Sequence, residues 1–310
     1  LLKTPTVIAL PFSSELYRDR LGKVVAQFRT VYFLNYFNLN YLPFFAVMGN
    51  DSSKSKSSSS KGVASTLGIR AGPSQATVQR HIENAQKSRI LQLKSCGLKA
   101  LPPSLEELFE VIRNLELSQN KIKELPPSIG NFTVLKQLHL SENALTELPH
   151  EIGMLKNLEI LNVQSNKLSS LPDSLVGCTS LKTLNVSANN FSQFPVPVCH
   201  LMSLETLNLA QNTITELPDE VSSLNASEVN LNQNRLNFLN GDALAKCPHL
   251  KILRVEENCL AKTEFTVNLL SHSPVSIISC SGNIFQDREF QDLPGYEDYQ
   301  ERFTATRRKM

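Results

Sequence analysis

The chain has 310 residues, of which 41% are hydrophobic, and its 31 Lys and Arg against 29 Asp and Glu give a formal net charge of +2. This length allows one large domain or two ordinary ones, and the apolar share allows a sizeable core. The nearly balanced charge gives no support to nucleic acid or a strongly acidic molecule as partner.

The first 47 residues are rich in aromatic side chains. Ten of the 21 Phe and Tyr lie before Met48, seven of them in "TVYFLNYFNLNYLPFFAV" (30–47). This run is interrupted by Asn and Pro and is too short for a membrane-spanning helix. It also does not resemble a secretory signal, because the run begins only at residue 30 and no A-x-A-like cleavage site follows it. We expect residues 1–47 to be either spurious upstream sequence or a disordered extension.

A lipidation pattern follows at Met48. Met48, Gly49, Ser53 and Lys54 form M-G-x-x-x-S-K, which is typical of N-terminal myristoylation. Together with the change in composition, it predicts that translation starts at Met48 and that Gly49 carries a myristoyl group. If "MG" is internal, Gly49 has no free amine and cannot be acylated. The pattern predicts a cytoplasmic protein held peripherally at a membrane by its lipid anchor, and not a secreted one.

Residues 48–75 are expected to be a disordered Ser/Lys-rich segment, because little in them can be buried. A short helix is predicted next, over 74–89, with Ser74 as its cap. Val78, Ile82 and Ala85 fall on one face of this helix, so it can close the end of a larger core.

From residue 90 onward the sequence repeats itself. "LELSQNKIKELPPSIG" (115–130), "LHLSENALTELPHEIG" (138–153) and "LNVQSNKLSSLPDSLVG" (161–177) are the clearest copies. A polar residue recurs every 22–25 positions, first as Cys96 and then as an Asn ladder. The ladder comprises Asn120, Asn143, Asn166, Asn189, Asn212, Asn234, Asn258 and Asn283.

This pattern, L-x-x-L-x-L-x-x-[N/C]-x-L, resembles that of the leucine-rich repeats. It implies an α/β solenoid, or horseshoe, of about nine repeats over residues 76–305 with helical N- and C-terminal caps, followed by a basic tail at 306–310. The alternating leucines predict short strands with one buried face, which only stacked neighbours can cover. We expect the ladder Asn side chains to satisfy backbone groups in the turns. The Leu-Pro pairs should end each strand and lead into short helical turns.

The C-terminal string "LPGYEDYQERFTATRRK" places Leu293, Tyr296, Tyr299 and Phe303 at helical spacing. We expect an amphipathic helix that caps the last repeat. The alternative is a helix that lies on a membrane surface, favoured only by the basic residues at its end.

Several strings narrow the resemblance further. "MGN", the "LPxxI" repeats, "LKILRVEENCL" and "YQERFTATRRK" are similar to a vertebrate family of intracellular leucine-rich repeat proteins over residues 48–310. The Ser/Lys-rich stretch at 51–72 is longer than this resemblance leads us to expect. The resemblance implies a small, lipid-modified intracellular protein without a defined biochemical role.

No catalytic or metal-binding constellation is visible in the sequence. The six His are scattered, "HEIGM" (150–154) lacks the second His of a zinc-binding helix, and no nucleophile or phosphate-binding motif occurs. The six Cys form no C-x-x-C pair and indicate reduced thiols rather than disulfides. We therefore expect a protein that is not an enzyme and that uses no cofactor and no metal.

The remaining candidate is the concave face of the solenoid. We expect one outward residue at the middle of each strand, and a second row two positions later with Ser118, Ser141, Gln164, Ser187, Ala210, Asn232 and Glu256. The first row comprises Glu116, His139, Asn162, Asn185, Asn208, Asn230 and Arg254. These side chains are either ordinary solvated strand residues or a face that hydrogen-bonds a protein or peptide.

Three functions compete at this stage. The first is a monomeric, non-enzymatic adaptor at a membrane, and the second is a regulatory subunit of a phosphatase, GTPase or ubiquitin-ligase assembly. The third, a fragment of an extracellular receptor, is disfavoured because the sequence shows neither terminal cysteine caps nor a secretory signal. The missing basic stripe disfavours a nucleic-acid ligand.

Overall fold

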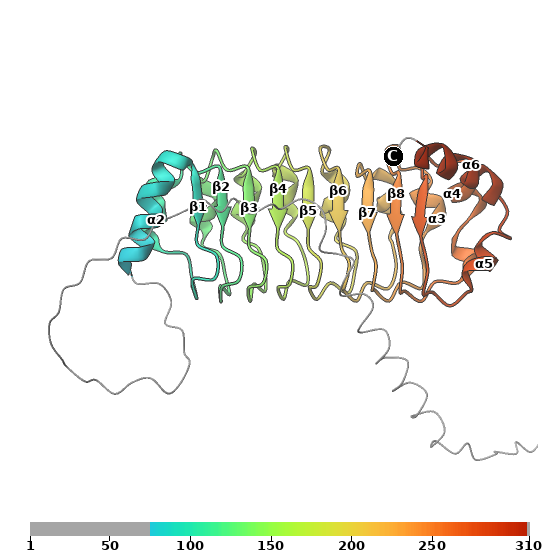
Figure 1. Ribbon diagram of the computed structural model, residues 1–310, viewed down its shortest axis with the longest axis horizontal. Coiled ribbons are helices and arrows are strands. Elements are labelled where there is room, and N and C mark those ends of the chain that lie inside the picture. Colours follow the sequence, from blue (N-terminus) through green and yellow to red (C-terminus); the bar gives the residue numbers. More distant parts are fainter. Residues whose placement is uncertain (1–74, 309–310) are drawn as a thin grey trace, which may run out of the picture. The chain divides into compact units, whose positions relative to one another are not determined.

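The structure, a computed structural model, describes residues 75–308, with side chains from Val78 onward. Its centre is one sheet of nine parallel strands that lie side by side in chain order, as Figure 1 shows. Each strand has three residues. The strands are β1 (Ile90–Gln92), β2 (Asn114–Glu116), β3 (Gln137–His139), β4 (Ile160–Asn162), β5 (Thr183–Asn185), β6 (Thr206–Asn208), β7 (Glu228–Asn230), β8 (Ile252–Arg254) and β9 (Ile277–Ser279).

The middle residue of each strand faces the core. Leu115, Leu138 and Leu161 pair in register along β2, β3 and β4, and all three are fully buried. From β1 to β8 the Leu or Val two positions after the middle residue, such as Leu117, Leu140 or Val163, is buried as well. One repeat therefore presents apolar side chains that only its neighbours can cover, and the stacked repeats share one continuous core.

Short 3-10 helices form most of the opposite side, which we call the turn face. Each of the first six follows a Pro in extended conformation, because Pro has no N–H to continue a strand and its φ suits the start of a helix. These helices are η1 (Pro103–Leu108), η2 (Pro127–Asn131), η3 (His150–Met154), η4 (Asp173–Gly177), η5 (Val196–His200) and η6 (Asp219–Ser223). After β7 the turn face changes to α3 (Gly241–Leu244), η7 (Lys262–Glu264) and α4 (Val267–Ser271).

Glycines let the turns η2, η3 and η4 approach closely. A Cβ atom on Gly153 would overlap the backbone carbonyl of Ser174, and one on Gly177 would overlap the carbonyl of Gly153. A Cβ on Gly130 would lie 2.9 Å from the carbonyl oxygen of Glu151. Since backbone cannot move aside cheaply, the spacing of these turns depends on missing side chains.

The N-terminal end of the sheet carries helix α2 (Gln75–Ser88), drawn in cyan beside β1 in Figure 1. Val78, Ile82 and Ala85 are buried in the core, as their helical spacing predicts. The predicted cap Ser74 lies outside the described residues, so its role stays a prediction. Helix α2 thus covers apolar surface that the first repeat would otherwise expose.

The C-terminal end carries α5 (Asp287–Phe290) and α6 (Tyr296–Arg307). Tyr299 is buried, and Leu293, Tyr296 and Phe303 pack against the core, so the helix covers the last repeat with the face that the sequence predicts. The alternative of an apolar face left for a membrane surface is wrong, because the core already covers these side chains. Helix α6 also extends two residues into the segment predicted as a basic tail.

Two side chains of α6 bond the backbone at this end. The Tyr299 hydroxyl accepts the N–H of Ile278 in β9 at 3.0 Å. The Arg302 guanidinium donates to the carbonyls of Val275, Ser271 and Leu270. A terminal strand has unpaired backbone groups that invite another chain, and here Tyr299 satisfies one of them, the N–H of Ile278. The Arg302 bonds satisfy carbonyls at the end of α4 and in the loop before β9.

Candidate functional site

The outward residues of the strands form a surface that we call the sheet face. The predicted row runs in register from Glu116 through His139, Asn162, Asn185, Asn208 and Asn230 to Arg254. The prediction that these residues occupy the middle of each strand is wrong. They are the third and last residues, because the strands have only three residues and the middle one is the buried Leu or Val.

A further outward row, at the first residue of each strand, was missed from the sequence. It includes Ile160, Thr183, Thr206 and Ile252, all half-buried. The period-two alternation around the buried middle residue is the signal that could have found it. The sheet face is therefore wider than the single row expected.

The second predicted row is only partly available to a ligand. Ser118 and Ser187 are about 95% buried, so the expectation that both point outward is wrong. Ser118 accepts a hydrogen bond from the Ser141 hydroxyl, and the Ser187 hydroxyl donates to Asn185. These two serines support the neighbouring side chains instead of offering contacts of their own.

The Asn ladder lies beneath the sheet face, where the chain turns out of each strand. Asn166 is typical: its side-chain oxygen accepts the N–H of Leu145 in the preceding repeat, at 3.0 Å. Its Nδ2 donates to the carbonyls of Leu140, Val163 and Gln164. The same arrangement recurs at Asn120, Asn143, Asn189, Asn212, Asn234 and Asn258, and with two donated bonds at Asn283.

The residue before Cys96 and before each ladder Asn adopts a left-handed conformation. Its φ lies between 53° and 59° in eight repeats, and Gly282 holds the position in the last one with φ of 78°. The eight residues are Ser95, Gln119, Glu142, Ser165, Ala188, Gln211, Gln233 and Glu257. Because L-residues avoid this region, each turn carries a backbone cost that the ladder bonds offset.

Each of the four Asn at the centre of the sheet face makes the same type of internal hydrogen bond. The side-chain oxygen of each accepts the backbone N–H two residues later, at 3.0–3.1 Å. These residues are Asn162, Asn185, Asn208 and Asn230. The bond fixes the orientation of each amide before any ligand arrives.

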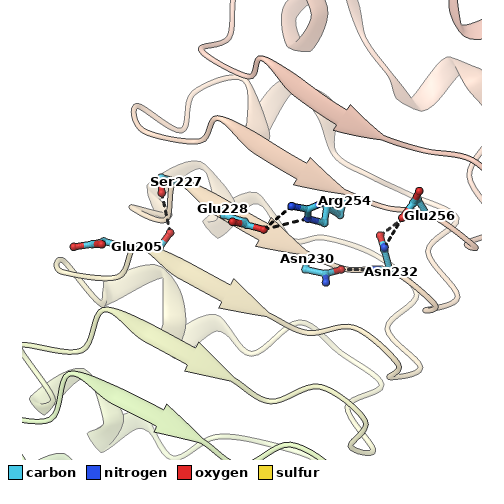
Figure 2. Close-up of polar contacts among 7 residues, drawn as sticks. All are labelled: Glu205, Ser227, Glu228, Asn230, Asn232, Arg254 and Glu256. Carbon is cyan, nitrogen blue, oxygen red and sulfur yellow. Dashed lines mark hydrogen bonds and ion pairs between the residues drawn. The ribbon is translucent and has the colours of Figure 1, made fainter. Parts of the chain in front are cut away.

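Charged residues flank this centre. Figure 2 shows the C-terminal side, where Arg254 donates to Glu228 across β7 and β8 at 3.0 and 3.1 Å. Beside them Asn232 donates to Glu256 at 2.6 Å, and its own oxygen accepts the backbone N–H of Glu256. Both partners of the ion pair are about one third exposed, so we assign it ~0–1 kcal/mol. The pair neutralises charge next to the amide row.

The described cysteines are free thiols, and the buried ones are poorly suited to act as nucleophiles. Burial raises the pKa of the Cys178 thiol to about 12 and that of Cys247 to about 11, which opposes formation of the reactive thiolate. Among the residues that the structure describes, no group of His, Cys, Asp and Glu is placed to hold a metal ion. None of the helices between residues 75 and 308 combines the length and apolar character needed to cross a bilayer.

Comparison with known proteins agrees with this geometry. Residues 133–191 match the family model "Leucine rich repeat", and residues 203–224 match a second model of the same description. The chain carries leucine-rich repeats. Such repeats typically form protein–protein interaction modules.

Solved structures of low sequence identity share the fold. The leucine-rich repeat domain of APL1B aligns with a TM-score of 0.55 at 20% identity, over 71% of this chain and 66% of that one. Internalin C2 from Listeria monocytogenes aligns with a TM-score of 0.55 at 19% identity, over 68% of this chain and 95% of that one. The APL1 leucine-rich repeat domain gives 0.53 and 23%, over 63% and 49%. The fold is a leucine-rich repeat solenoid, and the chain spans 37–66% of the first four solved structures that it matches.

Proposed function

We propose that this chain is a non-enzymatic, monomeric interaction module whose sheet face binds a protein or peptide partner. The observation that carries the proposal is the row of four Asn side chains on β4–β7, half-exposed and each fixed by an internal hydrogen bond. Fixed polar groups lose little conformational freedom on binding, which favours affinity. A ligand held by electrostatics, such as nucleic acid, is disfavoured because no basic stripe follows this row.

The test is capture of partners by the chain expressed from Met48 in eukaryotic cells, by proximity labelling and pull-down. Replacing both Asn185 and Asn208 with Arg should abolish capture of a genuine partner, because two long cations would cover the centre of the row. Thermal stability should hardly change. The matched control is substitution of the exposed turn-face residues Lys156 and Glu220. If capture survives the Arg substitutions but is lost in the control, the sheet face is not the binding surface.

The identity of captured proteins separates two forms of this proposal. An adaptor should bring down proteins of several kinds. A regulatory subunit of a phosphatase, GTPase or ubiquitin-ligase assembly should bring down the corresponding enzyme in a fixed ratio. Both forms use the same face, so the variants above apply to either.

We also propose that the protein starts at Met48 and is anchored to membranes, on the cytoplasmic side, by a myristoyl group on Gly49. Support comes from the M-G-x-x-x-S-K pattern alone, since Gly49 lies outside the described residues. Myristate by itself binds bilayers with about 10⁴ M⁻¹. Lys54, Lys56 and Lys61 can add on the order of 1 kcal/mol each at an anionic surface. The anchor should therefore be reversible and sensitive to salt.

Intact-mass and N-terminal peptide analysis of protein from eukaryotic cells tests the anchor. We expect a myristoyl group on Gly49 and a reduced membrane fraction for Gly49→Ala. Tryptic peptides from residues 1–47, or an unchanged membrane fraction, would rule the anchor out. On the strings "LKILRVEENCL" and "YQERFTATRRK" we further propose kinship with leucine-rich repeat-containing protein 57 of vertebrates. Sequence alignment of residues 48–310 with that protein checks it.

A further inference from the structure

The amide row on the sheet face has a fixed chemical polarity. Each of Asn162, Asn185, Asn208 and Asn230 uses its oxygen to accept a backbone N–H. Only the carbonyl end of an amide can accept such a bond, so the NH₂ end must be the free one. Figure 2 shows this for Asn230, whose oxygen faces Asn232 while its nitrogen points away.

Most of these NH₂ groups have no acceptor within the described part of the chain. Asn185 donates to Gln164 over a long 3.3 Å, and no hydrogen bond from Nδ2 of Asn162, Asn208 or Asn230 to another described residue is present. The centre of the sheet face therefore presents a row of donors. A ligand that supplies acceptors at the same spacing would complement it.

The spacing of the row decides which backbone conformation of a partner fits it. The four Asn occupy neighbouring strands in register, so three strand spacings, ~14 Å, separate the first from the last. On an α-helix, residues at i, i+3, i+7 and i+10 lie on one stripe and span about 15 Å. Four same-side residues of an extended strand span roughly 20 Å. The helix matches the row, and the extended chain does not.

The donor character of the row decides which side chains of a partner can bind to it. Glu and Asp carboxylates accept hydrogen bonds and donate none, whereas Gln and Asn would bring NH₂ groups against the donors. Hydrogen bonds to an ionised acceptor are also the stronger ones. The outward first residues on β4, β5 and β6 are Ile160, Thr183 and Thr206, which place no like charge beside an incoming carboxylate. On β7 the first residue is Glu228, whose carboxylate is paired with Arg254.

We propose that the sheet face binds an α-helix of a partner protein that carries Glu or Asp at i, i+3, i+7 and i+10. This inference rests on the proposed function and names the class of partner. The helix lies along the solenoid, across β4 to β7. Its carboxylates accept from the side-chain amides of Asn162, Asn185, Asn208 and Asn230.

The experiment uses the full chain and fluorescently labelled, alanine-rich helical peptides, with binding followed by anisotropy. One peptide carries four Glu in the stripe, a second carries four Lys at the same positions, and a third has four Glu dispersed around the helix. The decisive variant is Asn185→Asp with Asn208→Asp. Asp is nearly isosteric and keeps an oxygen for the internal N–H, but it replaces each outward donor with an acceptor.

We expect the unmodified chain to bind the Glu stripe at least tenfold more tightly than the dispersed or Lys peptide. The double Asp variant should lose at least tenfold in affinity for the Glu stripe and gain affinity for the Lys stripe, with an unchanged melting temperature. The control is Asn131→Asp with Asn190→Asp, which adds the same charge at exposed sites outside the row and should change affinity less than threefold.

Two results would overturn the inference: equal binding of the striped and dispersed Glu peptides, or a double Asp variant that binds like the unmodified chain. If the peptides fail while the Arg substitutions at Asn185 and Asn208 still abolish capture of natural partners, the sheet face is the binding surface and the helical class of partner is wrong. If both fail, the proposed function is wrong as well.

Discussion

The central repeats, from β3 to β7, and the C-terminal end, from β8 to α6, share the Asn ladder, but the end adds an aromatic cluster and a closing helix. In the centre, each ladder Asn bonds its own and the preceding repeat, and 3-10 turns stack on the other side. At the end, Phe265, Phe285, Phe290, Tyr296 and Tyr299 form edge-to-face aromatic pairs with ring centroids 5.2–5.8 Å apart. An interior repeat has two neighbours to satisfy it, whereas the last repeat has one and needs a closing helix.

The largest effect should come from the glycine stack in the central turns. Gly153→Ala places a Cβ against the Ser174 carbonyl, so the turns must move apart, and we expect a loss of about 3 kcal/mol in unfolding free energy. Val176 occupies the equivalent position in the next turn and is exposed. Val176→Ala is therefore the control, with a loss below about 1 kcal/mol. Chemical denaturation measures both, and equal losses would show that the turns are not tightly stacked.

The ladder should matter more in the centre than at the end. Asn166→Leu removes one accepted and three donated bonds and leaves buried backbone groups unpaired, so we expect a loss of ~1–3 kcal/mol. Asn283→Leu removes one donated bond fewer from a half-buried site, so its loss should be smaller. An unchanged denaturation midpoint for Asn166→Leu would contradict the role assigned to the ladder.

At the C-terminal end, Tyr299→Phe removes the hydroxyl that accepts the Ile278 N–H. We expect a loss of about 1 kcal/mol, because the ring stays buried and only one bond is lost. The effect should be local to β9 and α6. Amide hydrogen exchange should show faster exchange at Ile278 and unchanged protection in β4, and a uniform change across the sheet would argue against a locally acting cap.

The smallest effect should be a gain in the centre. Ala188 has a φ of 53°, and the equivalent residue in the last repeat is Gly282. Ala188→Gly relieves the left-handed conformation, partly offset by the greater freedom of Gly when unfolded, so we expect a gain of about 0.5 kcal/mol. The control Ala144→Gly, outside the left-handed positions, should lose roughly 0.5–1 kcal/mol. Thermal melts of the two variants show whether Ala188→Gly raises the melting temperature and Ala144→Gly lowers it.

The central repeats and the C-terminal end also differ in how much of their structure the sequence could predict. The period of the ladder predicts the repeat, the buried strand residues and the place of each turn, because every copy has the same residue pattern. The end of the chain is not repetitive, so the roles of Arg302 and Tyr299 toward the backbone could not be read from spacing. The polarity of the amide row was also beyond prediction, since it depends on which end of Asn185 faces the Ser187 N–H.

On the proposed function, the sheet face of the central repeats is a preformed protein-binding surface. Its most direct test is amide hydrogen exchange of the chain with and without a captured partner. We predict that protection rises in peptides covering β4 to β7, around Asn162, Asn185, Asn208 and Asn230, and stays unchanged in η3 to η6. Protection that rises on the turn face or on α6, and not on β4 to β7, would show that another surface binds the partner.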